Sequence, residues 1–280
     1  MDLPVRPLPG GFGAVVECDL GAAGASGPSP LLVRALHRFR FLVFPGQHLN
    51  HADLLATAEC FGTVDTDVDR RYSVGGFPGI TAISNIVEHD VRVGIYDGDQ
   101  EEEWHADGCF KPTLPRATLL YSVITPQHGG LTRFADATRA FADLPAEQQR
   151  RIEGLRAVHS VQRLATQQAL ASAGQSSAAA GSLNDRPEVE HPLAPEHPVT
   201  GARSLLLGPM VISSITGLSP QASSSLLAEL TTHATSPPYV YSHRWGQGDL
   251  VVWDNRATLH TASPCDSSRH HRLLYRASVN

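Results

Sequence analysis

Lysine is almost absent from this chain of 280 residues, since Lys111 is the single lysine among 22 basic residues. The net charge is −6 at pH 7, and the sequence contains neither a run of basic residues nor basic residues interleaved with aromatics. Nucleic acids and anionic membrane surfaces are bound by such clusters of positive charge. The composition therefore argues against both kinds of partner.

Cysteine is also scarce: the four cysteines are far apart, and no Cys-x-x-Cys pair occurs. This spacing predicts neither a disulfide framework nor a zinc cluster. The N-terminus lacks a basic start followed by an apolar core, and no apolar run reaches the length of a membrane span. We expect a cytoplasmic protein with reduced thiols, and its richness in arginine and alanine suggests a bacterial genome of high GC content.

Apolar residues make up 41% of the chain and charged residues 18%, as in ordinary globular proteins. Internal repeats and linkers are not apparent, so we expect one domain over residues 1–280. The helices expected from apolar periodicity and capping residues are 31–38, 50–60, 136–157 (interrupted at Leu144-Pro145) and 219–233. The expected strands are 39–44, 80–86, 117–124, 131–134, 203–207, 239–245, 249–253 and 272–279.

Many short strands with a few helices predict a mainly β fold with helical decoration, either a β-sandwich or a jelly roll. Two segments look like loops that could close over a site. Residues 87–103 are acidic and contain glycine, and residues 160–185 consist mostly of Ala, Ser, Gln and Gly. Such segments bury little apolar surface, so both are candidate lids.

The stretch 104–110 contains the most promising chemical group, His105-Ala106-Asp107. In an extended segment residues i and i+2 point to the same side, so both side chains could reach one ion. The pair alone is weak, because a surface His and Asp near a turn would look the same. His51-Ala52-Asp53 also fits the pattern, but there we expect the first turn of a helix, where Asp53 meets the helix dipole.

His260 lies seven residues after Trp253 and follows an Asp-Asn-Arg turn. A lone histidine in such a place is more often structural than a ligand. Together with His105 and Asp107, however, it would form a set of three ligands, two imidazoles and one carboxylate, on one face of a metal. Non-haem Fe(II) oxygenases hold their metal in this way.

Arg272 and Arg276 share a face of the expected strand 272–279, because they are an even number of residues apart. If that face is interior, both guanidinium groups need anions, since unpaired buried charge is costly. A carboxylate or sulfonate bound by two parallel hydrogen bonds would suit them. The alternative is two exposed arginines on an edge strand.

Four motifs follow in the order His-x-Asp, Gly-Gly-x-Thr, Trp-Asp-Asn-Arg-x-x-x-His and Arg-x-x-x-Arg, at residues 104–110, 129–132, 253–260 and 272–276. This order resembles the taurine dioxygenase (TauD/TfdA) family, and weaker likeness extends over nearly the whole chain. The resemblance implies a double-stranded β-helix (jelly roll) and an enzyme that uses Fe(II), 2-oxoglutarate and O2.

The resemblance also implies roles for individual residues. The iron ligands would be His105, Asp107 and His260. Thr132 and Arg272 would hold the distal carboxylate of 2-oxoglutarate, with Arg269 as the alternative to Arg272. The candidate substrate-binding residues are Arg276, which would face an anionic group, Asn85 and Phe110. The carboxylate of Asp107 disfavours halogenation, because the related halogenases have a small residue there.

The expected reaction is oxidation, by default hydroxylation, of a C–H bond in a small anionic molecule, with release of succinate and CO2. Segment 160–185 differs from the taurine enzyme, which favours tailoring of a natural product over scavenging of a sulfonate or carboxylate. A homo-oligomer is expected from the resemblance alone. Two alternatives stay open: a cupin-like metalloenzyme without 2-oxoglutarate, and a non-catalytic jelly-roll protein that binds a small molecule.

Overall fold

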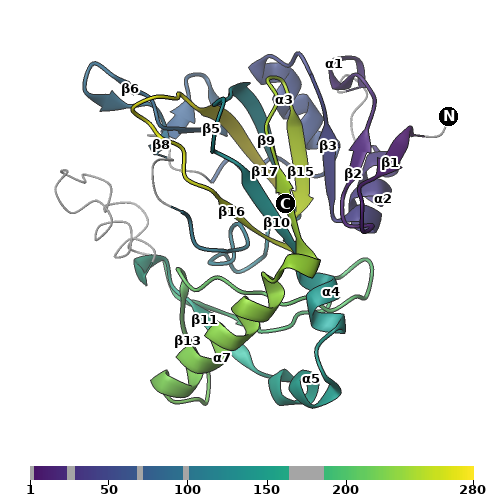
Figure 1. Ribbon diagram of the computed structural model, residues 1–280, viewed down its shortest axis with the longest axis vertical. Coiled ribbons are helices and arrows are strands. Elements are labelled where there is room, and N and C mark those ends of the chain that lie inside the picture. The colour runs from purple at the N-terminus through teal and green to yellow at the C-terminus, as the bar shows by residue number, and fades with distance from the viewer. Residues whose placement is uncertain (1–2, 24–28, 68–71, 97–100, 164–185) are drawn as a thin grey trace.

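The computed structural model describes residues 3–23, 29–67, 72–96, 101–163 and 186–280, and within them two facing β-sheets form the body of the protein (Figure 1). The larger sheet has nine strands in these residues, in the order β1-β2-β3-β15-β9-β17-β5-β4, with β8 also paired to β5. Its strands are β1 (Val5–Pro7), β2 (Ala14–Val16), β3 (Phe41–Phe44), β15 (Leu250–Asp254), β9 (Ala117–Ile124), β17 (Leu273–Val279), β5 (Phe77–Ser84), β4 (Ser73–Val74) and β8 (Ile95–Tyr96).

The smaller sheet contains β14 (Val240–His243), β10 (Thr132–Asp136) and β16 (Thr258–Ala262), in that order. Between the two sheets lies a core of large apolar side chains, among them Phe41, Phe134 and Trp253. Phe41 stacks on Phe134 with ring centroids 5.1 Å apart. Two sheets packed face to face in this way make a jelly roll, which confirms the fold class predicted from the sequence.

Helices α1 (Leu20–Ala23), α2 (Pro30–Phe39) and α3 (His51–Glu59) cover the outer face of the larger sheet (Figure 1). Two of them begin where the sequence predicts. Ser29 caps α2 and is followed by a proline at the first position, while Asn50 and Asp53 form a capping box on α3. The His51-Ala52-Asp53 pattern is therefore part of a helix start.

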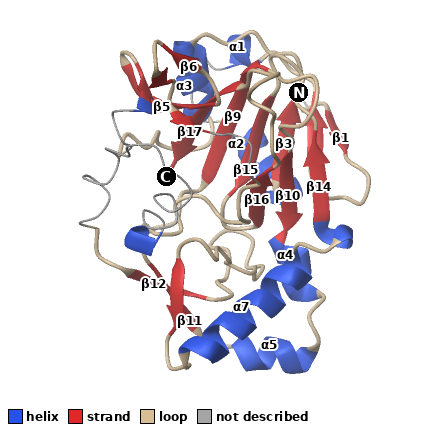
Figure 2. Cartoon of the chain, turned by 60° about the vertical axis from the view of Figure 1, so that its left-hand side comes forward, coloured by secondary structure: helices blue, strands red, loops and turns tan. Residues whose placement is uncertain are grey.

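A second group of elements lies at one end of the sandwich (Figures 1 and 2). It contains α4 (Ala137–Ala142), α5 (Ala146–Ile152), α7 (Pro220–Ala234), η4 (Pro237–Tyr239) and the sheet of β12 (Val189–Pro192), β11 (Arg156–His159) and β13 (Ile212–Ile215). Buried leucines and alanines from these elements form an apolar cluster of their own, which also receives Ala106 and Cys109. The segment that carries His105 and Asp107 thus lies between the sandwich and this end.

Several sequence expectations differ from the structure. Residues 204–207 are buried but belong to no strand; Leu205 and Leu206 donate their amides to helix and loop carbonyls instead. Helical structure ends at Ile152 because Glu153 is extended and Gly154 has a φ of +73°, so β11 follows. Strand β16, which carries His260, is not among the strands expected from the sequence.

The two candidate lids fall partly outside the described residues, at 97–100 and 164–185. Residues 87–92 form a hairpin of β6 (Val87–Glu88) and β7 (Val91–Arg92). Within the described part of the chain, every helix is too short or too polar to cross a membrane. All four cysteines are described, and none of them forms a disulfide.

Candidate active site

His105 and His260 are held side by side by the main chain. The amide of His105 donates to the carbonyl of His260 at 3.0 Å, and the amide of His260 donates to the carbonyl of His105 at 2.8 Å. The two imidazole rings consequently lie with centroids 4.3 Å apart. Residues 155 positions apart (260 − 105) are thereby fixed as neighbours by backbone geometry rather than by side-chain packing.

Asp107 points to the same place. Its Oδ1 is 4.0 Å from Nε2 of His105, and its Oδ2 is 3.9 Å from Nε2 of His260. One ligand atom from each of the three side chains lies within 4.8 Å of the others. The structure therefore brings together the three residues that the sequence singled out.

The atoms that these three side chains present to one another could accept a cation. The Nδ1 of His105 lies 2.8 Å from the carbonyl of Glu103, so this nitrogen must donate and the Nε2 lone pair is left for a metal. Burial lowers the pKa of His260 to about 3, so the ring is neutral near pH 7. Oδ2 of Asp107 and Nδ1 of His260 are buried and have no hydrogen-bond partner among the described residues.

Burial by itself would raise the pKa of Asp107, but His260 and Arg276 outweigh it and bring the pKa to about 2. Because His260 is neutral near pH 7, Arg276 is the positive charge that matters there. Its Nη1 lies 3.5 Å from Oδ1 of Asp107. A carboxylate that stays ionised beside two imidazole rings fits a divalent cation such as Fe(II).

A second polar group lies in the same interior, around Arg272. This side chain is only 1% exposed, and burial lowers its pKa to about 10, so it stays charged at neutral pH. Its Nη2 lies 3.5 Å from Oγ1 of Thr132, and that oxygen also accepts a hydrogen bond from Nε1 of Trp245 at 3.0 Å. With both lone pairs engaged, the Thr132 hydroxyl proton is free to be donated to a bound anion.

Gly130 makes room for this arginine. The residue has a φ of +62°, and a Cβ on it would come within 3.2 Å of Cδ of Arg272 and 2.7 Å of Cγ of Pro126. Glycine is the residue that adopts this backbone conformation without strain. The Gly-Gly-x-Thr motif thus supplies both the close approach to Arg272 and the hydroxyl beside it.

A family model described as "Taurine catabolism dioxygenase TauD, TfdA family" matches residues 4–278. The chain belongs to this family. The alpha-ketoglutarate-dependent 2,4-dichlorophenoxyacetate dioxygenase of Cupriavidus pinatubonensis is 35% identical over 280 residues, covering 96% of this chain and 94% of that protein. Pentalenolactone F synthase of Streptomyces arenae is 31% identical, covering 99% and 95%. The crystal structure of AAD-2 in complex with Mn(II) and N-oxalylglycine is similar with a TM-score of 0.78 at 28% identity, covering 100% and 97%.

Enzymes of the TauD/TfdA family use Fe(II), 2-oxoglutarate and O2. The described structure offers His105, Asp107 and His260 for the metal, and it offers Thr132 and Arg272 for a carboxylate. Arg269, the alternative to Arg272, is exposed and lines a shallow surface cavity of about 390 Å³ instead. The geometry therefore favours Arg272 as the partner of 2-oxoglutarate.

The three candidate substrate-binding residues lie in different surroundings. Arg276 is on β17, a central strand, and reaches Asp107, so the alternative of an exposed edge strand is wrong. The amide of Asn85 is engaged by the backbone: its Oδ1 accepts from the amide of Arg272 at 2.8 Å, and its Nδ2 donates to the carbonyl of His270 at 2.9 Å. Phe110 packs with Trp104 against the apolar cluster beside α4 and α7.

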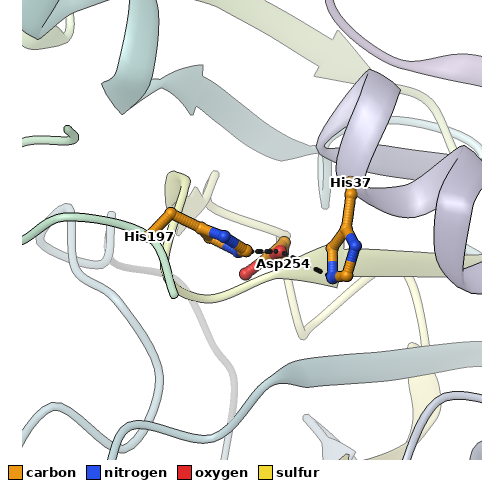
Figure 3. A group of neighbouring side chains, drawn as sticks. All are labelled: His37, His197 and Asp254. Carbon is orange, nitrogen blue, oxygen red and sulfur yellow. Dashed lines mark hydrogen bonds and ion pairs between the residues drawn. The ribbon is translucent and has the colours of Figure 1, made fainter. Parts of the chain in front are cut away.

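A second group of side chains, His37, His197 and Asp254, also has ligand atoms within 4.8 Å of one another (Figure 3). Nδ1 of His197 accepts the amides of Val199 and Thr200, each at 3.1 Å. The ring proton must then sit on Nε2, which donates to Oδ2 of Asp254 at 2.9 Å, so no lone pair is left for a metal.

The carboxylate of Asp254 is also engaged by Arg256, whose amide and Nε lie 3.0 and 3.2 Å from Oδ1. A cation would have to displace these donors and sit beside a guanidinium. We therefore assign this group as an anchor that fixes the end of β15 and the turn before β16. Neither this anchor nor the role of Trp245 is apparent from the sequence, although a buried indole N–H normally needs an acceptor.

Proposed function

We propose that this protein is an Fe(II)- and 2-oxoglutarate-dependent dioxygenase that oxidises, most simply by hydroxylation, a C–H bond of a small anionic molecule. The observation that carries the proposal is that His260, beside His105 and Asp107, and Thr132, beside the buried Arg272, lie on the paired strands β16 and β10. A metal site alone would fit many enzymes; its combination with a buried Arg272 and a hydroxyl donor is specific.

Within this proposal, one set of residues binds the metal and another binds the co-substrate. His105, Asp107 and His260 would hold iron on one side and leave the opposite side open to ligands. Arg272 and Thr132 would bind and orient the distal carboxylate of 2-oxoglutarate. Iron, O2 and 2-oxoglutarate supply the oxidising chemistry, which yields succinate and CO2. The apolar core around Trp253, whose ring centroid is 4.8 Å from that of His260, keeps water from that side of the site.

Arg276 supports an anionic substrate. Its side chain is 31% exposed while its guanidinium reaches the metal site, so it could bind an anion that enters from solvent. One relative is named for its action on 2,4-dichlorophenoxyacetate, which is a carboxylate, and the name pentalenolactone F synthase supports a role in natural-product biosynthesis. Asn85 and Phe110 stay proposed substrate contacts.

We also propose that residues 1–280 act as a single catalytic domain in the cytoplasm, without a nucleic-acid or membrane partner, and that identical chains associate. Cysteines without disulfides support a reducing compartment, and the net charge of −6 argues against polyanionic partners. Light scattering on the purified protein tests the association.

The function is tested by anaerobic titration of the metal-free protein with Fe(II) and then 2-oxoglutarate, followed by the weak visible absorption band of the chelate. The band should appear in the wild type, be absent in His105→Ala, and require much more 2-oxoglutarate in Arg272→Ala. Arg269→Ala is the matched control and should behave as wild type. Iron binding without the band would favour a cupin-like enzyme without 2-oxoglutarate; failure to bind iron would favour a binding protein.

With the band established, succinate release in the presence of O2 and candidate anions identifies the substrate class. Arg276→Ala should raise the KM for an anionic substrate while the KM for the co-substrate 2-oxoglutarate stays unchanged. An equal rise in both would contradict the separate assignment of Arg272 and Arg276.

A further inference from the structure

Asn255 lies in the turn between β15 and β16, five residues before His260. Its main-chain amide donates to the carbonyl of Arg116 at 3.1 Å, and its Nδ2 donates to Oγ1 of Thr118 at 2.9 Å. Asn255 is 1% exposed and Thr118 is fully buried. The bond joins side chains from two distant segments, and neither residue is a metal ligand or part of the carboxylate site.

Thr118 faces the metal site. On β9 it lies opposite Trp253 of β15 and opposite Ser278 of β17. Ser278 is two residues after Arg276, so the side chains of these two residues project from the same face of the sheet. Since Arg276 reaches Asp107 from that face, the Thr118 hydroxyl opens into the same interior. The hydroxyl is also among the groups that lower the pKa of Asp107.

The direction of the hydrogen bond from Asn255 determines which hydrogen bond the Thr118 hydroxyl can donate. Because Thr118 Oγ1 accepts from Asn255, its single proton is left for another acceptor. The two candidates are the Asp107 carboxylate and Oγ of Ser278, which lies 3.3 Å away. A carboxylate is the stronger acceptor, since hydrogen bonds to an ionised group are roughly twice as strong as neutral ones.

We propose that Thr118 and Asn255 are positioning residues for the metal: Asn255 orients the Thr118 hydroxyl, and the hydroxyl orients the Asp107 carboxylate. The inference rests on the proposed metal site. Asp107 is the one ligand that lies outside a regular strand and outside the main-chain bridge between the two histidines. Its printed hydrogen bond is from Arg276 Nη1 to Oδ1, so a second donor from β9 would limit rotation of the carboxylate. Outer partners of metal ligands commonly change metal affinity by about 10- to 100-fold.

The test is a titration of the metal-free protein with Mn(II), in which electron paramagnetic resonance measures the free ion. Thr118→Val keeps the shape but removes the hydroxyl, and the dissociation constant should rise about 10-fold. Thr118→Ser restores the hydroxyl and should stay within about 2-fold of wild type, whereas Asn255→Ala should fall between the two. Thr57→Val is the matched control, because Thr57 is a buried threonine on α3 whose hydroxyl has no partner among the described residues.

A purely structural role would lower the melting temperature of Thr118→Val and leave its Mn(II) affinity unchanged, and that result would overturn the proposal. Equal weakening in Thr118→Ser and Thr118→Val would also overturn it, because the hydroxyl would then not matter. The variant His105→Ala distinguishes failure of the proposed metal site from failure of the proposed role of Thr118. If that variant binds Mn(II) as wild type does, the proposed metal site itself is wrong; if it does not bind, only the role of Thr118 is under test.

Discussion

Replacing Thr132 by valine should damage both stability and 2-oxoglutarate binding, and the two effects can be separated. The threonine oxygen accepts from Nε1 of Trp245 at 3.0 Å and from Nη2 of Arg272 at 3.5 Å. Valine has the same shape but no acceptor. The indole N–H, in a side chain that is 6% exposed, would then be buried without a partner.

An unsatisfied buried donor costs about 1–3 kcal/mol, which corresponds to a fall in melting temperature of roughly 2–5 °C for a domain of this size. The lost hydrogen bond to a carboxylate is worth about 1.5–3 kcal/mol, or roughly 10- to 150-fold in the KM for the co-substrate. Thermal unfolding measures the first effect, and succinate release at varied 2-oxoglutarate measures the second.

Trp245→Phe is the partner variant, because it removes the donor and leaves the Thr132 hydroxyl in place. It should lower the melting temperature but leave the KM for the co-substrate within about 3-fold of wild type. In the double variant, adding Trp245→Phe should cost less stability than it does alone, by about 1 kcal/mol. A wild-type KM in Thr132→Val would refute the assignment of this hydroxyl to 2-oxoglutarate.

Three further changes have distinct expected outcomes. Gly130→Ala forces a Cβ against Arg272 at a φ of +62°, so it should raise the KM for the co-substrate and lower the unfolding free energy by about 1–2 kcal/mol, and an unchanged KM would argue against a tight cradle. Burial, and next the neighbouring His191, lowers the pKa of His159 to about 3. As pH falls, His159 is therefore protonated in the unfolded chain before it is protonated in the folded one, so the free energy of unfolding decreases between about pH 6.5 and pH 3. His159→Phe should remove about 2 kcal/mol of that loss at pH 5, measured by urea unfolding at pH 7.5 and pH 5, and an unchanged difference between the two pH values would contradict the buried neutral ring. The protein should bind one equivalent of Mn(II), not two, and His197→Gln should leave this number unchanged; a second equivalent that disappears in His197→Gln would show that the group around Asp254 is a metal site after all.

The parts of the fold predicted from sequence are those with local signals. Ser29 with Pro30 and Asn50 with Asp53 mark helix starts within a few residues, and the apolar run 117–124 matches β9 at both ends. Strand β16 has only five residues and is stabilised by pairing with β10, more than a hundred positions earlier. Residues 203–207 have the apolar content of a strand but find no partner strand, which the sequence does not reveal.

The candidate site, like the fold, could be predicted from the sequence only in part. The order of the four motifs resembles the TauD/TfdA family, and this resemblance is what singles out His105, Asp107 and His260 in the sequence. The partners of those motifs come from elsewhere in the chain: Trp245 reaches Thr132, and His197 reaches Asp254, by contacts between distant segments. Such contacts follow from the packing of two sheets, and no local pattern encodes them.

The reciprocal amide bonds between His105 and His260 would make metal binding at the proposed site depend on folding. These bonds close a very long loop of the chain, and the pocket forms only when the chain has lost the entropy of that open loop. Contacts between residues so far apart in sequence slow folding. Neither half of the polypeptide contains the pocket by itself. An ion that binds only the folded chain adds stability in proportion to the logarithm of its concentration over the dissociation constant. The supply of metal would thus set both how many chains are ready to react and how long each one stays folded.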